Sequence, residues 1–352
     1  MSEEKIATIN RDIRARAEQG DAEAQNDLGM LYQAGFGVAR DGAQAVVWYQ
    51  KAADQGVAKA QFNLGMMYQN GDGVEQDHAQ AFAWCRKAAE QGYSPAQNQL
   101  GAAYSDGWGV AQDDTQAVAW FRGAAEQGNA KAQFNLGVMY ENGRGVTQDH
   151  AQAVAWFRKA AEQGHAPAQF NLGVMYANGS GVRQDHVQAA AWYRKAAEQG
   201  HAPAQHSLGM MYGDGKGVTQ DPAEAAAWLR KAANQGYAPA QHSLGIMYWD
   251  GKGVAQDHAQ AAVWLRKAAE QGDVNAQLSL GVKYMEGGGV EEDDEQAIAW
   301  FLKAAKQGNL FAYLNINAVM DKQRLVAKQR QRAARNARAI AWFRRMVSLG
   351  RR

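Results

Sequence analysis

The sequence predicts an all-α protein built from stacked helical hairpins, and three observations carry that prediction. Glycine recurs every 36 residues from Gly20 to Gly308, tryptophan keeps the same step from Trp48 to Trp300, and tyrosine keeps it from Tyr32 to Tyr284. A fixed period of about 20 to 50 residues is the signature of a repeat protein. Eight full repeats therefore occupy residues 21–308, although a chain of 352 residues would otherwise suggest two ordinary domains.

Residues 1–20 predict an N-terminal capping helix. They end in "RARAEQG", which is similar to the "RKAAEQG" that ends several later repeats. The segment therefore reads as the second half of a repeat, and terminal half-repeats usually cap the stack.

The first half of each repeat predicts a helix, as residues 129–164 illustrate. Residues 130–141 carry an apolar stripe at helical spacing, formed by Ala132, Leu136, Met139 and Tyr140. Gly137 lies inside this helix, where glycine costs about 1 kcal/mol relative to alanine. Its recurrence in every copy predicts close approach by a neighbouring helix. A Gly-x-Gly such as Gly143 to Gly145 then predicts a turn with positive φ.

The second half of each repeat predicts another helix. Asp149 is the expected N-cap, with Gln152 three residues later closing a capping box, and Gly164 ends the helix. The expected packing face consists of Ala153, Trp156, Phe157, Ala160 and Ala161. A single hairpin cannot bury this face, so the repeats must stack into a continuous core.

Composition and the first residues predict where in the cell the protein is located. No apolar run approaches the roughly eighteen residues of a membrane span. The first residues are acidic where a signal peptide needs basic ones, so a cytoplasmic location is expected if Met1 is the true start. Cys85 is the only cysteine, which excludes an intramolecular disulfide and a cysteine-based metal site.

One set of residues recurs together and carries a family resemblance. In the second repeat the set reads Leu64-Gly65, Tyr68, Gly71-x-Gly73, Asp77, Ala81, Trp84 and Ala88-Ala89. This pattern resembles the Sel1-like repeat family, relatives of the tetratricopeptide repeats, over residues 21–308. The resemblance implies a right-handed α-superhelix whose first helices line the concave side. It also implies an adaptor or scaffold in protein complexes, as in bacterial members of the family.

Counted from residue 21, the resemblance places the sixth, seventh, tenth, thirteenth and fourteenth positions of each repeat on the concave side. The candidate partner-binding residues are Phe62, Asn63, Met66, Phe134, Asn135, Val138, Phe170, Asn171 and Val174, followed by His206, His242 and Trp249. A ladder of Phe and Asn could hold an extended peptide, with amides pairing to its backbone. The alternative is that the phenylalanines pack against the adjacent hairpin.

No catalytic, cofactor or metal site is predicted. His206 and His242 lie one repeat apart, so their side chains should be roughly 10 Å from each other, whereas zinc needs nitrogens converging at about 2.0–2.1 Å. They are better explained as surface histidines. A hydrolase, suggested by labels given to some relatives, has only Ser2-x-x-Lys5 in its favour, without partner motifs. No small-molecule substrate is expected.

Residues 309–352 predict an altered ninth repeat. "AIAWFRRMVSLG" repeats a second helix displaced by six residues, and the Gly-x-Gly turn before it is missing. A single helix from about Leu310 to Leu349 is therefore predicted. Its basic face carries Arg324, Lys328, Arg335 and Arg338. Its apolar stripe, expected to dock on the last repeat, carries Ala333, Ala337, Ile340, Phe343 and Val347.

The charge distribution adds a second functional hypothesis. Residues 322–352 hold eleven Lys or Arg and no Asp or Glu, so residues 1–321 hold 26 basic and 36 acidic residues, a net charge of −10. The first hypothesis is a non-enzymatic scaffold that binds a protein or peptide in its groove. The second is attachment of the basic helix to an anionic protein, a membrane surface, nucleic acid or the acidic body of a second copy. Nucleic acid is the least supported, because no reader motif is present.

Overall fold

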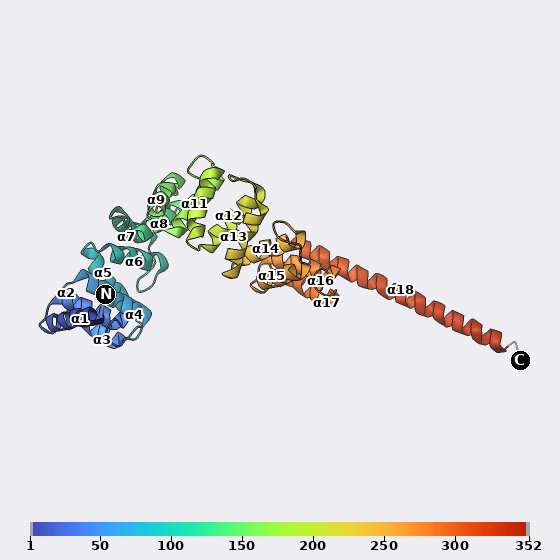
Figure 1. The fold of residues 1–352 in the computed structure, drawn as a ribbon, viewed down its shortest axis with the longest axis horizontal. Helices are drawn as coiled ribbons and strands as arrows, with labels where there is room; N and C mark the ends of the chain where they lie inside the picture. Colours follow the sequence, from blue (N-terminus) through green and yellow to red (C-terminus); the bar gives the residue numbers. More distant parts are fainter. Residues whose placement is uncertain (1–2, 350–352) are drawn as a thin grey trace. The chain divides into compact units, whose positions relative to one another are not determined.

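A computed structural model describes the backbone of residues 3–349 and the side chains of residues 7–342 (Figure 1). These residues contain eighteen α-helices and no strand. The predicted all-α class and the 36-residue hairpin period are confirmed. The chain divides into two compact units, residues 1–195 and residues 196–352, and each is described by itself.

Unit 1 holds the capping helix and the hairpins of the first repeats. Its helices are α1 (Glu3–Glu18), α2 (Ala22–Ala34), α3 (Gly42–Asp54), α4 (Ala58–Asn70), α5 (His78–Glu90), α6 (Ser94–Asp106), α7 (Asp114–Glu126), α8 (Ala130–Asn142), α9 (His150–Glu162), α10 (Ala166–Asn178) and most of α11 (His186–Glu198). As predicted, α1 packs against α2, with Ala17 buried beside Leu28.

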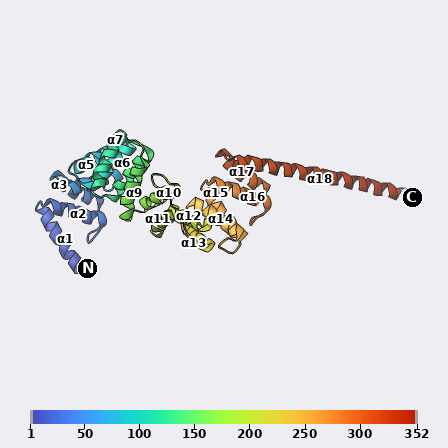
Figure 2. The same cartoon turned by 90° about the horizontal axis from the view of Figure 1, so that it is seen from above.

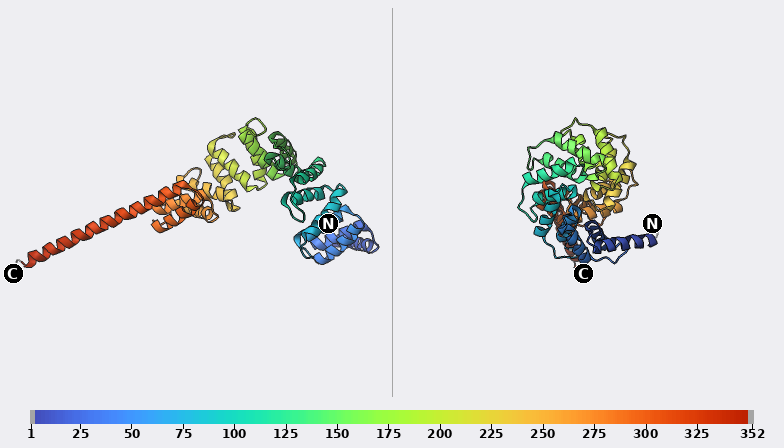
Figure 3. Two further views of the ribbon diagram at one scale, coloured as in Figure 1. Left: turned by 180° about the vertical axis from the view of Figure 1, so that it is seen from behind. Right: turned by 90° about the vertical axis from the view of Figure 1, so that its left-hand side faces the viewer.

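Unit 2 continues the series and ends in the longest helix. It contains the end of α11 followed by α12 (Ala202–Asp214), α13 (Pro222–Asn234), α14 (Ala238–Asp250), α15 (His258–Glu270), α16 (Val274–Glu286), α17 (Asp294–Lys306) and α18 (Leu310–Leu349). Figures 2 and 3 show α18 leaving α16 and α17 and continuing away from them as one helix.

The second helix of each repeat begins at the predicted aspartate. In α9 the Asp149 carboxylate accepts hydrogen bonds from the backbone N–H groups of Ala151 and Gln152. The predicted return bond of a capping box is wrong, because the Asp149 N–H instead donates to the carbonyl oxygen of Tyr140 at 2.9 Å. The N-cap therefore also ties the second helix to the first.

Two glycines of each repeat are required by close approach. A Cβ on Gly137 would lie 2.7 Å from the ring of Phe157 in the facing helix, so the predicted close contact is confirmed. Gly145 has a φ of 67°, and a Cβ there would overlap the carbonyl oxygen of Asp114 in the preceding repeat. The first glycine thus fits the two helices of one hairpin together, and the second fits one hairpin to the previous one.

A buried glutamine links the ends of successive hairpins, and the sequence reasoning missed it. Gln133 donates through Nε2 to the carbonyl oxygen of Ala125 at 3.1 Å and accepts at Oε1 from Gln163 at 2.7 Å. The same pair of bonds recurs two repeats earlier around Gln61, which bonds to Ala53 and Gln91. These bonds explain why "AQ" and "QG" both recur, since each buried amide needs partners.

The recurring tryptophan and tyrosine lie at the edge of the core. Trp156 is half-buried, and the Lys159 Nζ lies 3.9 Å from its ring centroid as a cation–π contact. Arg158 donates to the hydroxyl of Tyr176 in the next repeat at 2.9 Å. The buried centre of a repeat is formed by smaller residues and one larger one, for example Ala153, Ala160, Leu172 and Phe157.

Only the beginning of α18 is packed. Ala312 and Val319 are fully buried against α17, and Lys322 Nζ lies 3.0 Å from Asp294 Oδ1 and 2.5 Å from Glu292 Oε1. From residue 323 to residue 342 every side chain is exposed. The predicted docking of the apolar stripe is therefore wrong for Ala333, Ala337 and Ile340, while Phe343 and Val347 lie outside the described side chains.

Two departures from the repeat pattern accompany the uncovered end of α18. The Gly-x-Gly turn is missing, so one helix continues from Leu310 to Leu349 and does not reverse, and one contact glycine is replaced. In the eighth repeat Gly281 faces the ring of Phe301, and a Cβ on that glycine would overlap the ring. The residue 36 positions later is Asn317, which carries a Cβ. The segment 339–343, "AIAWF", repeats 297–301 and cannot pack on residues 310–322 in the usual way. The ninth hairpin therefore does not close.

Candidate binding groove

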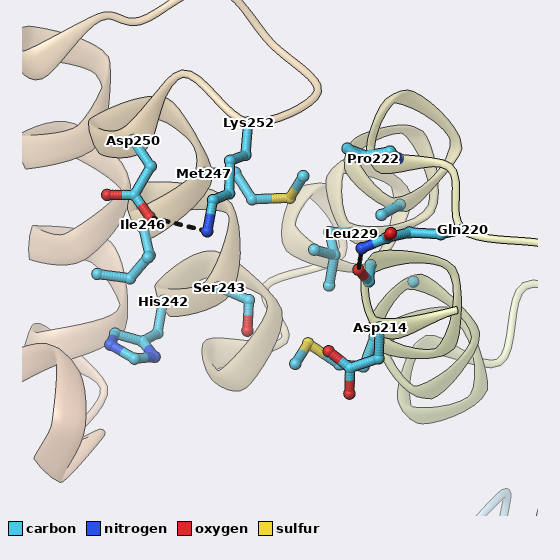
Figure 4. Close-up of a pocket in the computed structure, with 14 residues that line it drawn as sticks. Asp214, Gln220, Pro222, Leu229, His242, Ser243, Ile246, Met247, Asp250 and Lys252 are labelled. Atoms are coloured by element: carbon cyan, nitrogen blue, oxygen red, sulfur yellow. Dashed lines mark hydrogen bonds and ion pairs between the residues drawn. The ribbon is translucent and has the colours of Figure 1, made fainter. Parts of the chain in front are cut away.

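An apolar pocket lies between α12, α13 and α14 of unit 2 (Figure 4). Its volume is about 490 Å³, within the range of about 300–1,000 Å³ typical of ligand sites. Figure 4 shows Ile246 and Met247 of α14 on one side and Leu229 and Pro222 of α13 on the other. Met210, Asp214 and Asp250 complete this part of the lining. The pocket offers an apolar floor with carboxylates among its exposed residues.

The pocket exists because two positions of the sixth repeat carry small side chains. Gly213 stands at the thirteenth position, where every other repeat has a larger residue. A Cβ on Gly213 would meet only Ala225, at 3.9 Å. Leu229 stands where most other repeats place a ring, namely Tyr49, Phe121, Phe157, Tyr193 and Phe301. No neighbouring side chain fills the volume that a larger residue would occupy at Gly213 or Leu229, so the pocket remains.

In the seventh repeat the equivalent space is filled by Trp249. This residue lies 36 positions after Gly213, and its ring centroid is 4.1 Å from that of His258, the counterpart of Pro222. A Cβ on Gly288, the counterpart of Lys252, would overlap the Trp249 ring. The Lys283 Nζ lies 3.2 Å from the centroid of the same ring. The pocket of the sixth repeat thus lies where the indole lies one repeat later, except at the edge where Lys252 carries a Cβ and Gly288 does not.

A second apolar pocket adjoins the first. It has a volume of about 310 Å³ between α14, α16 and α18 and is lined by Leu278, Val282, Phe311 and Asn315. Ile246 lines both pockets, so they form one track along the first helices of consecutive repeats. We call these two pockets together the unit-2 groove.

The predicted aromatic positions of unit 1 are half-buried. Phe62 lies 5.6 Å from Tyr93 between ring centroids, Phe134 lies 5.8 Å from Phe157, and Phe170 lies 5.6 Å from Tyr193. Phe62 and Phe134 both pack against the buried cluster of a hairpin. Part of each ring therefore supports the stack, and a binding role for the exposed part stays a prediction. The same holds for the half-buried Met66 and Val174.

The predicted asparagines form bonds between repeats. Asn63 Nδ2 donates to Asn26 Oδ1 at 3.1 Å, and Asn135 Nδ2 donates to Asn98 Oδ1 at 3.0 Å. Within the described residues, the side chain of Asn171 makes no hydrogen bond. A cavity of about 130 Å³ lies beside Asn135 and Val138. Unit 1 thus has a smaller opening than unit 2 in the comparable region.

The two histidines stand at the sixth position of their repeats, where unit 1 has Phe62, Phe134 and Phe170 in three repeats and Asn26 and Asn98 in two. His206 Nε2 lies 3.3 Å from Ser243 Oγ, and His242 Nε2 lies 3.3 Å from Ser279 Oγ. The sequence predicts surface histidines, but both side chains are half-buried. Burial lowers the pKa of both, and for His206 the charge of His242 lowers the pKa further. His242 also lines the first pocket.

The charges near the groove are mixed. Asp214 is 3.2 Å from Lys216 Nζ, and Asp250 is 4.0 Å from Lys252 Nζ. Burial lowers the pKa of Lys283, against the opposing effect of Glu286 and Asp250. The predicted basic residues Arg324, Lys328, Arg335 and Arg338 are all exposed on α18, outside the groove.

Further classes of site were searched in the part of the chain that the structure describes. No group of three or more His, Cys, Asp or Glu side chains is placed to hold a metal ion there. Within the same residues, no helix combines the length and apolarity needed to cross a membrane. Ser2 and the Lys5 side chain lie outside the described parts of the structure.

The family is decided by the repeat match. The Sel1 repeat matches eight consecutive segments, residues 22–57, 58–93, 94–129, 130–165, 166–201, 202–237, 238–273 and 274–309. The chain is a Sel1 repeat protein. The predicted resemblance is confirmed over the eight repeats, and proteins of this Sel1 and tetratricopeptide-like fold commonly serve as protein-interaction scaffolds.

Two solved structures are similar over most of this Sel1 repeat protein. A Sel1 repeat protein from Oxalobacter formigenes is 38% identical, with a TM-score of 0.67, over 88% of this chain and 90% of its own. A protective antigen of uropathogenic Escherichia coli with an SLR fold is also 38% identical, with a TM-score of 0.50, over 88% of this chain and 82% of its own. No curated protein sequence matches the chain.

The groove of this Sel1 repeat protein was only partly predictable. His242 had been singled out and lines the pocket, whereas Gly213 and Leu229 had not been selected. The available signal was the loss of bulk at two positions of one repeat. Trp249 had been selected as a binding residue, but its ring packs against His258 and Lys283.

Proposed function

We propose that this Sel1 repeat protein is a non-enzymatic scaffold that binds a protein or peptide segment in the unit-2 groove. The observation that carries the proposal is the apolar pocket left beside Gly213 in a framework whose next repeat fills the same space with Trp249. An apolar side chain of a partner would gain burial there without requiring the framework to move. Fully burying such a side chain contributes about 1.5–3 kcal/mol.

The polar groups around the pocket are better suited to binding a peptide than to catalysing a reaction. His242 is engaged with Ser279, while Asp214 and Asp250 each lie near a lysine. These groups can orient a peptide by hydrogen bonds and charge, whereas catalysis needs a nucleophile or base aligned toward one point. We therefore propose no enzymatic activity and no small-molecule substrate.

The Phe and Asn positions of unit 1 form a second part of the proposal. The Asn171 amide has no hydrogen bond among the described residues and lies next to Phe170, so both are suited to contact a bound backbone and side chain. The double variant Phe134→Ala, Asn135→Ala tests this part. If it keeps full partner binding while its stability falls, these residues serve the stack alone.

The main test uses peptides selected from a random library on the intact chain. Affinity for the selected peptides would be measured for the wild type, Gly213→Trp and Gly213→Ala, after circular dichroism has shown equal helical content. Gly213→Trp places an indole in the pocket, displaced from the position of the Trp249 ring because Lys252 carries a Cβ where the next repeat has Gly288. We expect affinity to fall at least about tenfold. Gly213→Ala leaves most of the space open and serves as the matched control.

Two results would speak against the groove. One is that no peptide is enriched on the wild type over an unrelated helical protein. The other is that the selected peptides bind Gly213→Trp as tightly as the wild type, because the contact would then lie elsewhere.

A second candidate function is supported by the exposed part of α18. Between residues 323 and 342 this helix carries six Lys or Arg and no acidic residue, and all its side chains are exposed. We propose attachment to an anionic partner as this alternative. Salt separates the two proposals, since binding through exposed charges weakens as ionic strength rises, whereas binding through an apolar pocket persists.

A further inference from the structure

The outer part of α18 leaves apolar side chains uncovered. Ile340 is 56% exposed and Trp342 is 62% exposed. Trp342 is the only tryptophan among the exposed large apolar residues, because the other ten tryptophans of the chain are buried or half-buried in the stack. An indole on a solvated helix gains no stabilisation from burial, whereas tryptophan is strongly enriched at the centres of protein interfaces.

The rest of unit 2 cannot cover the outer part of α18. The ninth hairpin does not close, because the Gly-x-Gly turn is missing and α18 continues as one helix from Leu310 to Leu349. Trp342 lies twenty residues beyond Lys322, the last anchored residue of α18, which is about 30 Å along a helix. A continuous helix cannot bring Trp342 back to its own groove. A surface that covers Trp342 must therefore lie outside unit 2.

The charge of α18 limits which surface can cover it. Residues 323–352 contain ten Lys or Arg and no Asp or Glu, so two such helices repel each other side by side. Residues 1–321 have a net charge of −10. Near the groove, Asp214 and Asp250 lie at the ends of α12 and α14, where the helix dipole adds negative potential, and each lies beside a lysine that an arginine of α18 would have to displace. The acidic body of a second copy therefore complements the helix.

The unit-2 groove also fits the uncovered indole in shape. The pocket beside Gly213 corresponds to the space that the Trp249 indole fills one repeat later. Its lining by Met210, Leu229 and Met247 is apolar and adaptable, as contacts to an aromatic ring require. A helix lying in a groove with one aromatic anchor is a known mode of peptide recognition.

We propose that the unit-2 groove binds the C-terminal helix of a second copy, with Trp342 entering the pocket beside Gly213 and the arginines of α18 facing Asp214 and Asp250. This inference rests on the proposed groove function and names its partner. The contact joins two different surfaces, so each molecule offers both a helix and a groove. Such an interface forms open chains unless its rotation closes a ring.

The test is sedimentation velocity of the full chain over a concentration series at low and high salt. We expect the mean mass of the wild type to rise with concentration at low salt and the association constant to fall roughly tenfold at high salt. Gly213→Trp blocks the groove, and the double variant Ile340→Asp, Trp342→Asp disables the helix. Each should be monomeric by itself. Val187→Asp, at an exposed residue of α11, is the control and should associate like the wild type.

Mixing the two disabled variants gives the decisive result. The Gly213→Trp chain still has an intact helix, and the helix variant still has an intact groove, so the mixture should form a 1:1 dimer that neither variant forms alone. A mixture that stays monomeric overturns the inference, as does a wild type that is monomeric at every concentration or a Gly213→Trp chain that still associates.

Two further measurements separate this failure from that of the groove itself. If selected peptides bind the groove while the chain stays monomeric, the second-copy inference fails and the proposed function stands. If the helix variant loses binding to phosphatidylserine vesicles that the monomeric wild type binds, α18 serves a lipid surface, and the second-copy inference is likewise overturned.

Discussion

Repeats six and seven share one framework but differ at the thirteenth position, where Gly213 stands in one and Trp249 in the other. Both repeats keep the buried glutamine, with Gln205 and Gln241 each accepting a hydrogen bond from the glutamine that follows the second helix. Both place leucine, Leu229 and Leu265, beneath the glycine of the first helix. With Gly213, a pocket of about 490 Å³ is left in repeat six, whereas Trp249 fills the space in repeat seven, where His258 and Gly288 replace Pro222 and Lys252 around it.

This comparison separates the residues that build the stack from those that distinguish one repeat from another. The glutamine bonds, the aspartate caps and the close-packed glycines recur in the same geometry, and they are satisfied within the chain. Gly213 satisfies no packing need and creates an opening. In a protein of near-identical repeats, a position that departs toward a smaller side chain is therefore where a ligand can enter.

The largest expected effect comes from two alanine substitutions of opposite sign. Gly137→Ala places a Cβ against the ring of Phe157 and should lower the free energy of unfolding by about 1–3 kcal/mol. Gly213→Ala has only Ala225 nearby and should raise it by about 0.5–1 kcal/mol, since alanine favours a helix over glycine. Urea denaturation followed by circular dichroism compares the two variants. Equal effects would show that the space beside Gly213 is not open.

A smaller effect is expected from pH, because the two units differ at the sixth position. Unit 1 has Asn26, Asn98 and three phenylalanines there, none of which titrates, whereas unit 2 has His206 and His242, whose pKa values are lowered by burial. The unfolded chain then binds more protons than the folded one below about pH 6.5. The histidines' contribution should be fully present above that pH and be lost as pH falls through their lowered folded-state pKa values.

The matched variant for this prediction is His206→Asn, His242→Asn. It introduces the asparagine that unit 1 has at Asn26 and Asn98. The difference in thermal unfolding midpoint between pH 7.5 and pH 5 should be smaller in the variant than in the wild type. The groups facing His206 include His242, which lowers its pKa, and Asp273, which raises it for both histidines. An unchanged pH dependence would contradict a role for these two rings.

Much of the fold was predictable because the residues that begin and end each helix recur in all eight repeats. Asp149 as N-cap, Gly137 as the contact glycine and the long helix at residues 310–349 all follow from local rules. The buried Gln133 was missed because a polar residue gives no apolar signal. The docking of Ile340 was predicted wrongly because a continuous helix cannot fold back on its own beginning, and Ile340 is accordingly exposed on α18.

The groove was harder to predict than the stack, because it depends on space rather than on a residue. Its site residue His242 followed from divergence among copies, but the pocket itself depends on what Gly213 and Leu229 lack. Whether a small residue leaves a cavity depends on neighbours in the next two helices and the turn after them, such as Pro222, Ile246 and Lys252. No single-repeat pattern contains that information.

The most direct test of the central claim is whether the space beside Gly213 binds an indole. N-acetyltryptophanamide would be titrated into the full chain and followed by saturation-transfer NMR, with the wild type, Gly213→Ala and Gly213→Trp compared. The account predicts saturable binding to the wild type and to Gly213→Ala, and none to Gly213→Trp. Binding that Gly213→Trp leaves unchanged, or no binding to the wild type, would contradict it.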